Sequence, residues 1–128
     1  MINDDEIEIY LGQPISALLI DFIKNEFDDC DFCIDNSDGT VHMSSESLFV
    51  SLAESEFSLS SCWIKGRTKW SSDVEFARYC SKKIGCKVLC DPGLSFPDIP
   101  PHPNQFFRIE NGIETLINID DWHSKRQQ

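Results

Sequence analysis

The stretch SLFVSLAESEFSLSSCWIK, residues 47–65, decides the fold class. On each side of the segment ESE, apolar residues fall on one face of a predicted strand. They are Leu48, Val50 and Leu52 before it, and Phe57, Leu59 and Trp63 after it. A period of two residues is typical of a β-strand with one buried face, and a short polar connection joins two such strands as a hairpin. The stretch therefore predicts two antiparallel strands, over 47–53 and 57–65.

Further strand patterns lie on both sides of this hairpin. Residues 31–35 (DFCID) and 40–43 (TVHM) flank Asp38-Gly39, a dipeptide typical of hairpin turns. Near the end of the chain, Asn111-Gly112 is the strongest short hairpin signal in the sequence. It separates the two strands predicted within QFFRIENGIETLINI, residues 105–119. Single strands are predicted over 6–11 (EIEIYL) and 86–90 (CKVLC).

Two segments have the three-to-four-residue spacing of amphipathic helices. The first is predicted over 14–27, with Pro14 as its first helical residue. Its apolar stripe consists of Ile15, Leu18, Leu19, Phe22, Ile23 and Phe27. The second lies within 70–86, where Ser72 and Glu75 have the spacing of a capping box and Gly85 ends the helix. Its stripe consists of Phe76, Ala77, Cys80 and Ile84.

The order of these elements predicts the fold class. Runs of strands interrupted by two helices are typical of α+β, with both helices on one face of a mainly antiparallel sheet. An arrangement with one parallel strand pair after a helix is the alternative. We expect one domain over residues 1–128, with 119–128 as a frayed tail. Residues 92–103 hold five of the six prolines and are expected to form a loop of this domain.

The charge is strongly acidic and unevenly distributed. The net charge is −11. Residues 1–64 contain 14 acidic residues and one base, Lys24, whereas residues 65–128 contain 8 acids and 10 bases. Such a field repels nucleic-acid phosphates and anionic membranes and attracts basic proteins. The chain has no apolar run of about 18 residues and no signal-peptide pattern at its start, so we expect a cytoplasmic protein with reduced cysteines.

Six cysteines raise the question of metal or redox chemistry, but their spacing and neighbours argue against both. In a strand, Cys30 and Cys33 would point to opposite faces. Cys86 and Cys90 would lie roughly 13 Å apart, too far to share one ion. Acidic neighbours would raise the thiol pKa of the first pair and reduce its reactivity. We therefore expect no metal and no cofactor, and interpret the cysteines as small apolar residues that fill the core.

No catalytic motif stands out either. The sequence has no nucleophile elbow and no phosphate-binding loop, and DNSDG (35–39) fails the EF-hand pattern. We therefore expect no enzyme. A small enzyme or ligand-binding domain, with a pocket near His102 and the segment Trp63–Trp70, remains an alternative, and so does a zinc-bound module. The bases within 63–70 could also grip nucleic acid, but we favour a turn with both tryptophans in the core.

Five aspartates are the candidate partner-binding residues. They are Asp28, Asp29, Asp31, Asp35 and Asp38, around the end of one helix and one hairpin. Negative charge at a helix C-terminus opposes the helix dipole, which suggests that these carboxylates serve a purpose other than local stability. The proline-rich loop either adds Phe96 and Ile99 to the surface that meets the partner or covers one end of the core as a lid.

In size, acidity and element order, the chain resembles the small acidic α+β immunity proteins with which bacteria neutralise their own toxins in the cytoplasm. Many of these toxins are basic nucleases, and an acidic surface can cover their active sites by electrostatic complementarity. The resemblance implies a non-enzymatic inhibitor with a basic protein as its partner. Phage-encoded inhibitors of host defence nucleases share the same general character and remain an alternative.

Overall fold

The computed structural model describes residues 6–35, 37–55, 59–92 and 105–118. The predicted tail and most of the proline-rich loop lie outside these ranges. In chain order the elements are β1 (Glu6–Leu11), α1 (Ala17–Glu26), β2 (Asp31–Ile34), β3 (Val41–Ser44), β4 (Leu48–Glu54), β5 (Ser60–Gly66), α2 (Asp73–Ile84), β6 (Val88–Cys90), β7 (Gln105–Glu110) and β8 (Ile113–Asn118).

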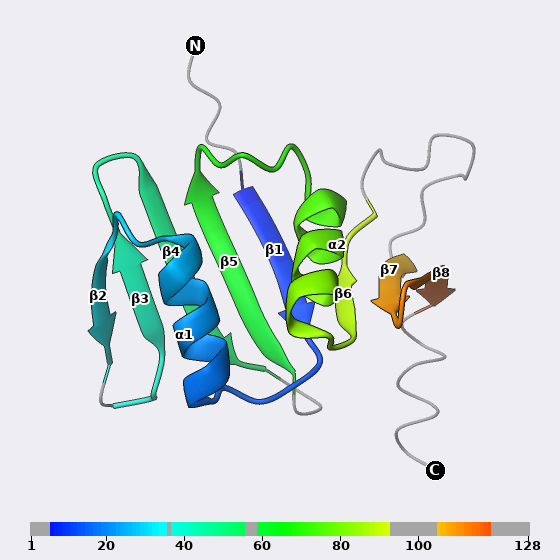
Figure 1. Cartoon of the computed structure of the whole chain (residues 1–128), viewed down its shortest axis with the longest axis horizontal. Coiled ribbons are helices and arrows are strands. Elements are labelled where there is room, and N and C mark those ends of the chain that lie inside the picture. The colour runs from blue at the N-terminus through cyan, green and yellow to red at the C-terminus, as the bar shows by residue number, and fades with distance from the viewer. Residues whose placement is uncertain (1–5, 36, 56–58, 93–104, 119–128) are drawn as a thin grey trace.

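Within the described residues, the strands form one eight-stranded sheet in the order β2-β3-β4-β5-β1-β6-β7-β8. Every neighbouring pair is antiparallel, so the alternative with a parallel pair is wrong. Figure 1 shows α1 and α2 side by side on one face of the sheet, which confirms the predicted α+β class. The first strand of the chain, β1, lies at the centre, between β5 and β6.

The core lies between this face of the sheet and the helices. Ile9 at the centre of β1 is opposite Cys62 on β5 and Cys90 on β6, and all three are fully buried. The helices cover this layer with their own buried residues, which are Leu19 and Ile23 from α1 and Val74, Phe76, Ala77 and Cys80 from α2. A central strand that is buried by the helices and paired on both edges holds the two halves of the sheet together.

Helix α1 begins later than predicted. Ser16 is its N-cap, and its hydroxyl accepts a hydrogen bond from the Leu19 backbone N–H at 3.2 Å. A Ser N-cap satisfies an N–H that the helix leaves unpaired, so the helix starts at Ala17 and Pro14 precedes it. In a helix that begins at Ala17, Leu19 and Ile23 point into the core, whereas Leu18 is 71% exposed. Placing Leu18 on the apolar stripe was therefore wrong.

Helix α2 follows its sequence signals closely. The Ser72 hydroxyl accepts a hydrogen bond from the Glu75 N–H at 3.2 Å, and the Glu75 carboxylate accepts one from the Ser71 N–H at 3.0 Å. At the other end, Gly85 has a φ of 79° and donates its N–H to Ser81 at 2.8 Å. The predicted capping box and glycine stop are confirmed, with Ser71 in place of Ser72 as the residue that Glu75 reaches.

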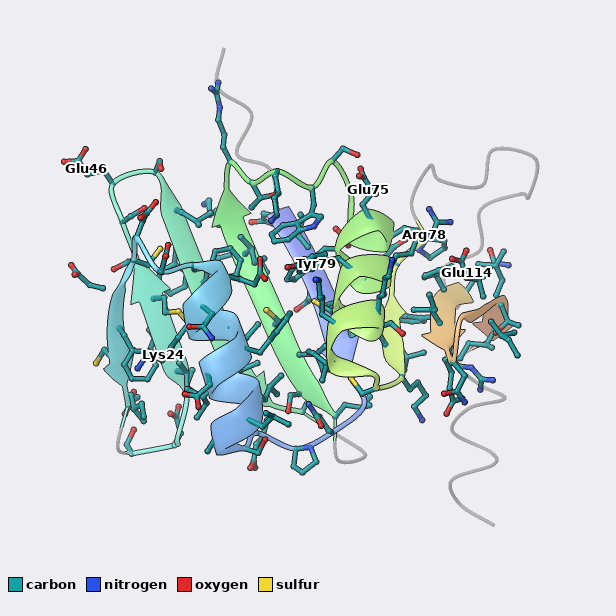
Figure 2. All side chains as sticks on the ribbon, viewed as in Figure 1. Lys24, Glu46, Glu75, Arg78, Tyr79 and Glu114 are labelled. Carbon is teal, nitrogen blue, oxygen red and sulfur yellow. The ribbon has the colours of Figure 1, made fainter. Side chains whose placement is uncertain are left out.

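One polar contact joins the two helices. The Tyr79 hydroxyl on α2 donates a hydrogen bond to the Glu26 carboxylate on α1, and this bond is the largest cause that raises the pKa of Tyr79 to about 12. Lys69 Nζ lies 3.6 Å from the same carboxylate. The Phe22 and Tyr79 rings pack nearby, 6.2 Å apart. Figure 2 shows Tyr79 in the space between the helices. The contact fixes how α1 lies beside α2.

Candidate functional site

Strand β2 lies at one edge of the sheet and carries the predicted partner-binding region. Among the described strands it pairs only with β3, and all four of its residues are exposed. Phe32 and Ile34 are 37% and 43% exposed. Large apolar side chains at this exposure, on a strand with an unpaired edge, are a feature that soluble proteins normally avoid.

The five predicted aspartates are distributed along this edge. Asp28 and Asp29 lie in the connection from α1 to β2, and Asp31 is the first residue of β2. Asp35 and Asp38 lie at the opposite end of the strand, in the connection to β3. Figure 1 shows these two connections at the two ends of β2. The structure thus brings all five residues to one edge of the sheet, in two groups.

The two groups differ in how their carboxylates are used. Asp35 accepts hydrogen bonds from the Ser37 N–H at 2.9 Å and the Ser37 hydroxyl at 2.7 Å, and these bonds lower the pKa of the Asp35 carboxyl. Asp38 accepts a bond from the Thr40 N–H at 2.8 Å. Within the described residues, the side chains of Asp28, Asp29 and Asp31 make no hydrogen bond or ion pair. Those three remain available to a partner, whereas Asp35 and Asp38 also shape the hairpin turn.

Lys24 is the one base in this region of the sequence. Residues 17–54 contain nine acids and Lys24 alone, a net charge of −8. Lys24 lies in the last turn of α1, where a cation interacts favourably with the helix dipole. Its Nζ lies 4.4 Å from the centroid of the Phe32 ring. The lysine therefore covers the helix side of β2, and within the described residues no ion pair neutralises the aspartates at the two ends of the strand.

The charge asymmetry of the sequence becomes an asymmetry in space. The sheet order places β2, β3 and β4, covered by α1, on one side, and β6, β7 and β8, beside α2, on the other (Figure 1). The segment from α1 through β4 has a net charge of −8, whereas residues 73–92 and 105–118, which form α2 and β6 to β8, contain five acids and five bases. One side of the molecule is thus strongly acidic, and the other has no net charge.

The alternative of a pocket near His102 and the segment Trp63–Trp70 stays a prediction, and the two tryptophans that bound this segment lie on opposite faces of the sheet. Trp70 packs on the helix side, with its ring centroid 4.4 Å from Phe76 and 6.1 Å from Phe27. Cys62 and Ile64 of β5 face the core, so Trp63 points to the opposite face of the sheet, where it packs 5.7 Å from Phe49. The expectation that both tryptophans lie in the core is therefore wrong for Trp63. His102, Phe96 and Ile99 lie outside the described residues.

The cysteines occupy three kinds of position. Cys62, Cys80 and Cys90 fill the core as predicted, and burial raises all three thiol pKa values, to about 12 for Cys62 and Cys90. Cys30 packs half-buried against the core, whereas Cys33 is exposed on β2 and does not fill the core. Among the described residues, no three His, Cys, Asp or Glu side chains are arranged to hold a metal ion.

A hollow of about 360 Å³ between α2 and the β7–β8 hairpin was not predicted. Arg78 on α2 and Glu114 on β8 lie at its border, and the guanidinium donates two hydrogen bonds of 2.9 Å to the carboxylate. Figure 2 shows the two side chains pointing toward one another. Because the residues are 36 positions apart, no local pattern in the sequence could have indicated this pair.

A group of carboxylates around the start of α2 was also missed. Asp73, the first residue of the helix, has its pKa raised to about 6, mainly by burial, with the charges of Asp91 and Glu8 as lesser causes. A hydrogen bond from the Glu8 backbone lowers that pKa in part. The segment SSD favours a helix start, but only the packing of α2 against β1 places Asp73 beside Glu8.

Comparison with protein-family models, with curated proteins and with solved structures finds no match for this chain. Within the described ranges, no helix has the length and apolar character needed to cross a membrane. The interpretation of the site therefore rests on its own geometry and charge.

Proposed function

We propose that this protein is a non-enzymatic inhibitor that binds a basic toxin or nuclease through the acidic edge of its sheet, at β2 and its connections. The observation that carries the proposal is the position of five aspartates along the edge strand β2. Three of them have no side-chain partner within the described residues. A localised negative surface of this kind accelerates encounter with a basic partner and orients it before contact.

The structure of the hairpin turn supports this role. Asp35 and Asp38 are held by Ser37 and Thr40, so their carboxylates are already oriented in the free protein. A preoriented charge loses less conformational entropy on binding than a freely rotating one. Asp28, Asp29 and Asp31 supply the charges that pair with the partner. The predicted contribution of Phe96 and Ile99, which lie outside the described residues, stays a prediction.

A pull-down from the lysate of the native host tests the proposal. The wild-type protein is compared with a variant in which Asp28, Asp29 and Asp31 are changed to Asn, while Asp35 is kept because it shapes the turn. A matched control changes Glu6, Glu46 and Glu54, which are exposed and lie outside β2 and its connections, to Gln. The control removes the same net charge from other places.

The proposal predicts one basic protein that the wild type and the control retain at low salt and that the Asn variant does not. It should elute at a defined salt step and should lose its toxic or nuclease activity when mixed with the wild type. If all three proteins retain the same partners, the acidic edge does not bind them and the proposal is wrong.

A further inference from the structure

Within the described residues, strand β2 leaves one of its two hydrogen-bonding edges unpaired, and the pairing with β3 shows which backbone groups lie on that edge. The Asp35 N–H donates to the Thr40 carbonyl on the β3 side at 2.8 Å. In an antiparallel ladder, residues alternate between those that bond to the neighbouring strand and those that point away from it. Asp35, Cys33 and Asp31 therefore bond toward β3, and the N–H and C=O groups of Phe32 and Ile34 point outward.

The side chains beside this edge differ between the two faces of the sheet. Phe32 and Ile34 are opposite Met43 and Val41, which are buried under the helices, so they point to the helix side. Asp31, Cys33 and Asp35 alternate with them and point to the side without helices. The edge therefore presents apolar groups on one face and carboxylates on the other.

We propose that a basic segment of the partner adds to β2 as a further antiparallel strand. Lys or Arg side chains of this segment alternate with apolar ones. The apolar side chains pack beside Phe32 and Ile34, and the basic ones lie beside Asp31 and Asp35. The segment takes up the outward N–H and C=O groups of Phe32 and Ile34. The inference rests on the function proposed above and specifies how the partner binds.

The charges favour this occupant over a second copy of the chain, and they favour β2 over the other edge of the sheet. A second copy of the chain that paired β2 with β2 would bring ten aspartates together at one interface, and like charges directly opposite are destabilising. At the other edge of the described sheet, β8 carries one acid, Glu114, and Arg78 neutralises it. Among the described strands, only β2 combines an unpaired edge with several carboxylates that no ion pair neutralises. The aspartates therefore prevent self-association and attract a basic strand.

The probe is a capped seven-residue peptide in which Lys or Arg alternates with Val. In antiparallel pairing, the peptide residues that hydrogen-bond to Phe32 and Ile34 have their side chains on the same face as these two residues. The valines occupy those positions, so N-methylation of the valine amides blocks the edge. N-methylation of the same number of Lys and Arg amides, which point away, is the matched control of equal charge.

Calorimetric titration at low salt should show that the parent peptide and the control bind similarly. The valine-methylated peptide should bind about tenfold more weakly or worse, because at least one backbone hydrogen bond is lost and a methyl group enters the edge. On the protein side, Ile34→Pro removes an outward N–H without removing a bond to β3, and proline is tolerated at such edge positions. Ile34→Pro should weaken binding of the parent peptide about as much as methylation of the valines does, whereas Ile34→Val should leave binding unchanged.

The results separate the strand addition from the proposed function. If the two methylated peptides bind equally and the Asp28, Asp29, Asp31 to Asn variant binds both more weakly, the strand addition is wrong and the acidic surface stands. If methylation matters but the Asn variant binds like the wild type, the strand addition stands and the electrostatic basis of the function is wrong. No binding of the parent peptide at low salt overturns the strand addition.

Discussion

Replacing Asp73 by Asn should stabilise the protein above pH 6 and change the pH dependence of its unfolding. The carboxyl of Asp73 is half-buried at the start of α2, and its pKa rises from 3.8 to about 6, chiefly because burial disfavours the charged form. Asn keeps the shape and an oxygen that can accept the hydrogen bond from the Glu8 backbone. The substitution therefore removes the cost of the buried charge and retains the contact.

The direction in which the free energy of unfolding changes with pH follows from proton binding to Asp73. Between pH 4 and 6 the folded state holds a proton on Asp73 and the unfolded state has lost it, so the free energy of unfolding falls as pH rises through this range. The full difference in pKa would correspond to about 3 kcal/mol. Because the side chain is only half-buried, solvent screening reduces this to about 1–2 kcal/mol. Loss of a favourable charge at the helix N-terminus subtracts about 0.5 kcal/mol, which leaves a net gain of about 1 kcal/mol.

Urea unfolding of the wild type and of Asp73→Asn, followed by circular dichroism at pH 4 and pH 7.5, measures the effect. Relative to the wild type, the free energy of unfolding of the variant should rise by about 1 kcal/mol more at pH 7.5 than at pH 4. Glu46→Gln removes an exposed carboxylate that points away from the sheet (Figure 2) and should change stability by less than about 0.5 kcal/mol. If Asp73→Asn changes the free energy of unfolding equally at both pH values, the charged Asp73 carboxylate does not destabilise the fold and the reasoning is wrong.

Three further substitutions test the packing. Tyr79→Phe removes the hydrogen bond to Glu26 and should cost about 1–2 kcal/mol in urea unfolding, and a protein as stable as the wild type would contradict the proposed link between the helices. Gly66→Ala should cost about 2–4 kcal/mol, since a Cβ there would collide with the Ser47 carbonyl, whereas Gly112→Ala, also at positive φ but with open space, should cost about 1 kcal/mol. Equal losses of stability in the two alanine variants would exclude the collision with the Ser47 carbonyl.

Local signals in the sequence were sufficient for the Asn111-Gly112 turn and for the ends of α2. Asn111 and Gly112 have φ values of 54° and 78°, the pair of left-handed conformations that a two-residue hairpin requires. Ser72 and Gly85 cap α2 where their residue types predict. In each case the decisive contacts join residues within a few positions of one another, so tertiary structure was not needed to predict them.

The orientation of β5 and the central place of β1 depend on distant contacts. Trp63 is the largest residue of its strand, and this size favoured the wrong face. The core instead takes Cys62 and Ile64, because they pack beside Ile9 and Ile7 of β1. No periodicity within residues 60–66 carries that information. A small cysteine next to a large tryptophan is a case in which hydrophobic pattern alone assigns the wrong side of a strand.

The candidate site was partly predictable for the same reason. The five aspartates stand out in the sequence by their number and closeness, and the structure confirms that they lie in one region. That β2 is an edge strand follows only from the order of the whole sheet. The roles of Asp35 and Asp38 in the turn follow only from hydrogen bonds to Ser37 and Thr40.

The central claim is that the aspartates around β2 attract a basic partner, and association kinetics test it most directly. The rate constant for association with the partner captured by pull-down is measured at rising ionic strength for the wild type, the Asp28, Asp29, Asp31 to Asn variant and the Glu6, Glu46, Glu54 to Gln control. The account predicts that the Asn variant associates about tenfold more slowly at low salt, and that the three rates converge as salt screens the charges. An Asn variant that associates as fast as the wild type at every ionic strength would contradict it.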